Sequence, residues 1–168
     1  MKYTLYNYTK LKGVKKMLTK IISIAIPLAV GGLSAFLTMD SMEAFSALNQ
    51  PPLSPPSWLF GVVWSILYIL MGIASYLIYN SGAEKEIKTK ALTIYGIQLL
   101  VNFFWSLIFF NWQQYFIAFI WLILLIVLII LTIMRFYPIN RNAAYLMIPY
   151  LLWCLFAAYL NFGIFILN

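Results

Sequence analysis

The sequence predicts an all-α membrane protein whose chain crosses the bilayer as a bundle of five helices. Three observations carry this prediction. Hydrophobic residues make up 64% of the chain and charged residues only 9%, whereas a soluble domain carries about 25% charged residues. The mean hydropathy is +0.92. The apolar residues form charge-free blocks of about 20 residues, the length that crosses a hydrocarbon layer of about 30 Å. A membrane barrel would instead alternate in polarity.

The blocks define the expected elements in chain order. A basic tail over residues 1–20 precedes a transmembrane domain over residues 21–168. The first block resembles a signal peptide, but it is longer than a signal-peptide apolar region and lacks a clean cleavage site, so we expect it to be retained. Since one central charge costs about 2.5 to 3.5 kcal/mol on insertion, every block is expected to span. The expected helices cover residues 21–39, 58–79, 91–110, 115–134 and 144–167.

The first two spans are joined by the longest connection, residues 40–57. Its four prolines, Pro51, Pro52, Pro55 and Pro56, exclude a regular helix and favour a stiff, extended path. Two interpretations remain open. The segment is either a lid over the outer mouth of the bundle, with Pro51, Pro55 and Pro56 as its stiff part, or a spacer.

The charges predict the orientation of the bundle. If all five blocks span, the 11 Lys and Arg residues fall on one side, and the other side carries only Asp40 and Glu43. The positive-inside rule then puts the N-terminus in the cytoplasm and the C-terminus outside, in a multi-pass protein of a bacterial cell membrane. The net charge of +7 is expected to meet lipid headgroups and not nucleic acid, which needs a basic face beside exposed aromatic residues.

Conventional catalysis lacks its usual residues. The chain has no histidine and a single cysteine, Cys154, which excludes a Ser-His-Asp or Cys-His nucleophile system, a histidine-ligated metal or haem, and an internal disulfide. No acidic residue lies inside a span, so a proton relay through carboxylates is excluded as well. We therefore expect no metal site and no resident cofactor.

Three spans carry polar and aromatic residues at helical spacing. Amides are costly in lipid, so these stripes are expected to face the bundle interior. Two interpretations remain open: the amides join the helices, at about 0.6 to 2 kcal/mol each, or they line an aromatic pocket for a planar lipophile. The fourth helix is almost uniformly aliphatic and is expected to face lipid or a partner chain. The stripe residues are Trp64 and Tyr68, then Gln98, Asn102, Trp105 and Ser106, then Trp153, Ala157 and Asn161.

Four stretches of the chain resemble a known family. They are the Gly31-Gly32 pair, LNQPPLSPPSWLFGVVWSILYILMGIASYLIY (48–79), VNFFWSLIFF (101–110) and PYLLWCLFAAYLNF (149–162). Their ordered Trp, Pro and Asn pattern is similar to that of the translocator proteins, also called tryptophan-rich sensory proteins or the TspO/MBR family.

The resemblance implies a five-helix bundle, homodimers and porphyrin binding. It further implies that Trp64 and Trp153 match the two tryptophans proposed to act in light-dependent porphyrin breakdown, and that Tyr68, Asn102, Trp105, Ser106 and Ala157 line the ligand. The expected function is binding of a porphyrin or a similar flat lipophile within the bundle, as a carrier or sensor. The alternatives are a photochemical porphyrin-degrading enzyme, with porphyrin as substrate, and a structural membrane subunit.

Overall fold

The computed structural model describes residues 2–41, 45 and 47–168, and within the first helix only the backbone of residues 2–10 and 12. These residues form helices and connections without a strand. Five helical segments of the described chain are long and apolar enough to cross a membrane: Gly13–Ser41, Ser57–Tyr79, Lys85–Asn111, Tyr115–Phe136 and Arg141–Leu167. The predicted fold class is confirmed. The orientation of the termini and the homodimer stay predictions.

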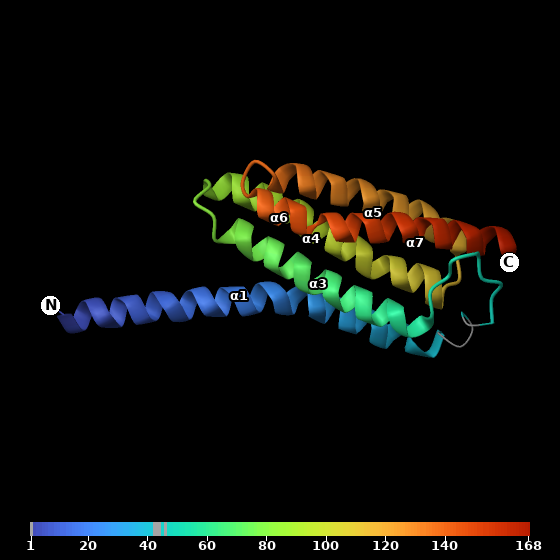
Figure 1. The fold of residues 1–168 in the computed structure, drawn as a ribbon, viewed down its shortest axis with the longest axis horizontal. Coiled ribbons are helices and arrows are strands. Elements are labelled where there is room, and N and C mark those ends of the chain that lie inside the picture. Colours follow the sequence, from blue (N-terminus) through green and yellow to red (C-terminus); the bar gives the residue numbers. More distant parts are fainter. Residues whose placement is uncertain (1, 42–44, 46) are drawn as a thin grey trace.

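The first helix is longer than the sequence suggested. α1 (Lys2–Thr38) includes the stretch expected as a tail, and its first half projects beyond the other helices (Figure 1). The only proline in α1 is Pro27, and the basic stretch before it is rich in lysine and leucine, which are good helix formers. The apolar pattern predicts which part of a helix can lie in lipid. It does not predict where the helix begins, because a helix can extend into water beyond the apolar block. A 3₁₀ turn, η1 (Met39–Ser41), ends this segment.

The second and fourth spans begin and end close to the expected residues, whereas the third begins six residues earlier than the expected residue 91. α3 (Ser57–Tyr79) starts directly after Pro56. α4 (Lys85–Ser106) continues into a π-helical turn, η2 (Leu107–Asn111), and α5 (Tyr115–Phe136) follows.

The last span is divided into α6 (Arg141–Leu146) and α7 (Ile148–Leu167). Asn140 caps α6, because its side-chain oxygen accepts a hydrogen bond from the backbone N–H of Ala143 at 3.1 Å. Pro149 lies in the first turn of α7, where its missing N–H costs no helical hydrogen bond. The break between α6 and α7 lies at Met147.

The helices form one bundle, in which neighbours lie side by side (Figure 1). α1 packs on α3 and α4, α4 packs on α5, and α5 packs on α7. α3 meets the last span mainly through α6, so α3 and α7 leave a groove between them. The aliphatic helix α5, expected to face lipid or a partner chain, exposes one face only. Its other face lies in the core, where Leu122, Leu125 and Ile129 are fully buried.

Candidate functional site

A cleft of about 430 Å³ lies where α1, α3 and the end of α4 meet. α1 contributes mostly small side chains to the lining, and α3 contributes aromatic ones. One wall of the cleft therefore consists of small residues and the other of aromatic rings. Hydroxyl groups at Ser34, Ser65 and Ser106 border it. The remaining lining residues are Leu28, Gly31, Gly32, Ala35, Thr38, Met39, Ser57, Phe60, Gly61, Trp64, Tyr68, Trp105 and Phe110.

The aromatic wall follows from helical spacing on α3. Trp64 and Tyr68 are four residues apart and therefore share a face, and their rings stack with centroids 5.6 Å apart at an interplanar angle of 29°. The Tyr68 ring presses against α1 at Gly31, where any Cβ atom would overlap the ring. A glycine at this position is thus required for Tyr68 to reach its place in the wall.

Asn102 holds Tyr68 from behind and does not itself line the cleft. The Tyr68 hydroxyl donates to Asn102 Oδ1 at 2.7 Å, and Asn102 Nδ2 donates to the Tyr150 hydroxyl at 3.0 Å. Asn102 is 1% exposed and Tyr150 is fully buried. This three-residue network joins α3, α4 and α7, and fixes the position of the Tyr68 ring.

Trp105 forms the floor of the cleft and borders a second, small cavity. Its Nε1 donates to Asn161 Oδ1 at 3.3 Å, and Asn161 Nδ2 donates to the backbone carbonyl of Tyr115 at 2.8 Å. The small cavity, of about 20 Å³, lies between Trp105 and α7, and Ala157 and Asn161 line it. Asn161 therefore joins helices and reaches a cavity at the same time.

Gln98 does not reach either cavity. It is fully buried one turn before Asn102, with Nε2 3.9 Å from the sulfur of Met71. Its Oε1 atom has no hydrogen-bond partner within the described part of the chain.

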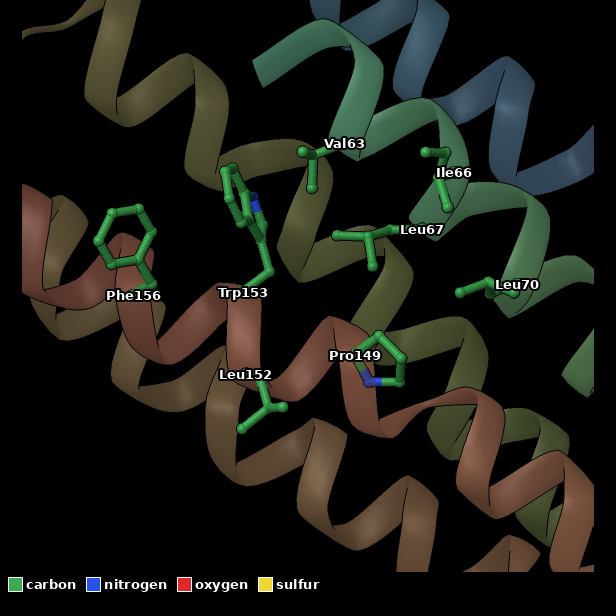
Figure 2. A pocket seen from close by; sticks show the side chains of 8 residues that line it. All are labelled: Val63, Ile66, Leu67, Leu70, Pro149, Leu152, Trp153 and Phe156. Carbon is green, nitrogen blue, oxygen red and sulfur yellow. The ribbon is translucent and has the colours of Figure 1, made fainter. Parts of the chain in front are cut away.

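Trp153 and Trp64 line different cavities. Trp153 lines the groove between α3 and α7 (Figure 2), whereas Trp64 lines the α1–α3 cleft. The Trp153 ring packs edge-on against Phe60 with centroids 5.8 Å apart, and Phe60 borders the cleft. The two tryptophans expected to act together thus face two different cavities.

The proline-rich connection is docked on the end of α7. The Tyr159 hydroxyl donates to the Pro52 carbonyl at 2.8 Å, and the backbone N–H of Asn49 donates to Asn168 Oδ1 at 2.9 Å. Pro51 packs on Gly163, where a Cβ atom would lie 2.6 Å from the proline ring.

Residues of this connection other than its prolines cover the small cavity. Gln50 and Phe45 line it, whereas Pro51, Pro55 and Pro56 line neither the cleft nor the small cavity. Residues 42–44 and 46 of the expected lid, including Glu43, lie outside the described residues.

The sequence interpretation missed the α1 wall of the cleft. Gly31, Gly32, Ser34 and Ala35 line it, and the signal that could have found them is a cluster of small residues followed by Ser34 and Thr38 at i and i+4. The sequence interpretation also missed Tyr150, whose hydroxyl accepts the hydrogen bond from Asn102. Nothing in the sequence around Tyr150, which follows Pro149, indicated this role.

The chemistry available in the cleft is stacking and hydrogen bonding. Among the described residues, no Asp, Glu, Lys or Arg lines the cleft, and no cluster of potential metal ligands occurs. The cleft can hold a flat apolar molecule and orient its polar edge, without acid or base groups.

Comparison with known proteins agrees with this architecture. The model of the TspO/MBR family matches residues 23–167, from α1 to the end of α7. The chain belongs to the TspO/MBR family. It is 37% identical to the tryptophan-rich protein TspO of Archaeoglobus fulgidus, over 90% of this chain and 98% of that protein.

Other TspO/MBR relatives are similarly distant. The chain is 38% identical to the translocator protein of Ovis aries over 76% of each chain. It is 31% identical to the tryptophan-rich sensory protein of Cereibacter sphaeroides over 90% of each chain. The TspO/MBR similarity therefore covers all five spans and makes this chain a multi-pass integral membrane protein.

Proposed function

We propose that this TspO/MBR family member binds a porphyrin or a similar flat lipophile in the α1–α3 cleft and acts as a membrane carrier or sensor. The observation that carries the proposal is the stacked Trp64–Tyr68 pair facing the small residues of α1. Ligand pockets in proteins commonly measure about 300 to 1,000 Å³, and the cleft has about 430 Å³. Stacking on the rings would hold a planar macrocycle, and the serine hydroxyls would pair with its polar edge.

Filling the cleft is expected to abolish binding. Gly61 lines the cleft, and a Cβ atom there meets no atom within 4 Å, so the backbone accepts a side chain at this position and Gly61→Phe is expected to put a ring into the ligand's space. Protoporphyrin IX titrated into the protein in nanodiscs, followed by quenching of tryptophan fluorescence, should show saturable binding to wild type and at least about tenfold weaker binding to this variant.

Gly96→Phe is the matched control. Gly96 is a helical glycine whose Cβ position is equally open, and it lies on an exposed face of α4 outside the cleft. The affinity of the Gly96→Phe variant for protoporphyrin should equal that of wild type. Equal affinities for both variants would remove the cleft as the site, and the absence of any saturable binding would favour a structural subunit.

Light-dependent breakdown of the bound porphyrin is the second candidate. Two oxidisable indoles, Trp64 and Trp105, line the cleft, and such a photochemical reaction would need no acid or base from the protein. Under illumination, loss of protoporphyrin absorbance should slow several-fold in Trp64→Phe and change little in Trp153→Phe, because Trp153 lies outside the cleft. Equal loss in wild type, both variants and protein-free nanodiscs would leave binding as the function.

A further inference from the structure

Of the five spans in the described chain, α1 has the smallest share of buried residues. In its apolar stretch 17% of the residues are buried, against 33 to 39% in the other four spans. Apolar packing alone holds such a helix weakly, because lipid tails are as apolar as the side chains that they replace, whereas hydrogen bonds between helices add to the association. Since α1 forms one wall of the cleft, the contacts that hold α1 also set how far the cleft opens.

The first attachment of α1 is its close packing on α3. The backbone of Ile24 fills the space beside Gly72, and the ring of Tyr68 fills the space where Gly31 would carry a Cβ atom. Most of the cleft residues of α1 come after these contacts, between residues 32 and 39. This part of the wall therefore needs a second attachment, at the end of the helix.

Asn111 provides the second attachment. Its Nδ2 donates to the carbonyl oxygen of Leu37 at 2.8 Å, and its Oδ1 accepts a hydrogen bond from the Ser41 hydroxyl at 2.8 Å. Leu37 lies in the last turn of α1, where carbonyl groups lack α-helical partners. Within the described part of the chain, these two are the side-chain hydrogen bonds that join α1 and η1 to the other elements.

The π-helical turn η2 places Asn111 beside the end of α1. Asn111 is the last residue of η2, which packs on α1, and the ends of α1 and α4 lie side by side (Figure 1). The N–H of Trp112 donates to the carbonyl of Leu107 at 3.0 Å, and the chain then turns at Gln113 with φ 52°. Turns of the π type occur frequently at functional sites. Phe110, directly before Asn111, lines the cleft, so the attachment and the cleft are adjacent.

We propose that Asn111 is a positioning residue that sets the opening of the cleft. While Asn111 is bonded to Leu37 and Ser41, the α1 wall stays against η2. When these bonds break, the end of α1 moves away and a flat lipophile enters or leaves. Entry and exit use the same open state, so loss of the bonds raises both rates by the same factor. The role toward a porphyrin rests on the proposed function, whereas the movement of α1 can be measured without a ligand.

Thiol labelling measures the opening of the cleft in the absence of a ligand. Ser34→Cys places a thiol on the α1 wall, at a position that is 4% exposed, so N-ethylmaleimide reaches it when α1 moves. The native Cys154 is fully buried, and its reaction is measured in the protein without the added cysteine. Adding Asn111→Ala should raise the labelling rate at position 34 about 2- to 12-fold, the range for one net hydrogen bond.

Asn142→Ala is the matched control. It removes the same amide from another exposed position, in α6, which contributes no described residue to the cleft. The labelling rate should not change in this variant. Ser41→Ala removes one of the two hydrogen bonds and should raise the rate less than Asn111→Ala does. An unchanged rate in Asn111→Ala, or an equal rise in Asn142→Ala, would overturn the proposal.

Stopped-flow fluorescence with protoporphyrin IX in nanodiscs tests the consequence for ligand exchange. In Asn111→Ala the association and dissociation rate constants should both rise by the factor found in labelling, and the dissociation constant should stay nearly unchanged. A residue that only stabilises the folded protein would not raise the association rate, so a rise in dissociation alone would contradict control of entry by Asn111. If wild type shows no saturable binding while Asn111→Ala still labels faster, the proposed function fails and the role of Asn111 in holding α1 stands.

Discussion

The Gly72→Val variant is expected to lose the packing of α1 on α3. At Gly72 a Cβ atom would lie 2.5 Å from the Cα atom of Ile24 and 2.9 Å from the carbonyl oxygen of Ser23. Both are backbone atoms of α1, so no side-chain rotation relieves the overlap, and the whole helix has to move. Overpacking a core usually costs about 1 to 3 kcal/mol, and we expect this variant at the upper end of that range.

Unfolding of the purified protein in mixed micelles, followed by circular dichroism, measures this loss. Because α1 forms one wall of the cleft, protoporphyrin binding should fall with stability. Gly96→Val is the control, since it introduces the same β-branched side chain into a helix where the Cβ position is open. A Gly72→Val protein as stable as Gly96→Val would mean that α1 and α3 do not approach each other this closely.

The spans were predictable because charged side chains and unpaired backbone N–H and C=O groups are strongly unfavourable in the hydrocarbon layer. α3 and α5 lie within about two residues of the ranges expected from the apolar blocks, 58–79 and 115–134. The start of α1 was not predictable in this way. Hydropathy reports what lipid accepts, and the lysines before Ile21 favour a helix in water as well.

The α3 side of the candidate site was predictable from spacing. Trp64 and Tyr68 share a face at i and i+4, and the structure brings them together with Trp105 and Ser106 at one cleft. The spacing of residues along a helix could not predict which cavity those residues line. Trp153 lies on the same stripe of α7 as Ala157, yet Trp153 lines the groove between α3 and α7 and Ala157 lines the small cavity. The path of one helix past another is set by packing.

The three amides, for which two interpretations were open, take different positions in the structure. Asn102 joins helices and stays behind the cleft, Asn161 joins helices and also borders the small cavity, and Gln98 lies in the core without a partner for Oε1. All three amide side chains are costly in lipid, so residue type and spacing predict that they are buried but not what they contact. Their partners depend on Tyr150 and on the carbonyl of Tyr115, which the spacing of each stripe does not specify.

The Asn102→Leu variant is expected to lose both stability and ligand affinity. The substitution removes the acceptor of the Tyr68 hydroxyl and the donor to the Tyr150 hydroxyl. Both tyrosines are buried, with Tyr68 7% and Tyr150 0% exposed, so water cannot replace the lost partner. An unpaired buried polar group costs about 1 to 3 kcal/mol. Protoporphyrin affinity should fall several-fold, because Tyr68 is no longer fixed in the cleft wall.

A triple variant separates the missing partner from the changed shape. In Asn102→Leu combined with Tyr68→Phe and Tyr150→Phe no hydroxyl is left unpaired, and replacing all members of a hydrogen-bonded group by apolar residues can be nearly neutral. The triple variant should therefore unfold at a higher detergent concentration than Asn102→Leu alone, although it lacks more hydrogen-bonding groups. If it is less stable than the single variant, the two hydroxyl groups stabilise the protein even without Asn102, and the unpaired hydroxyls cost less than their burial indicates.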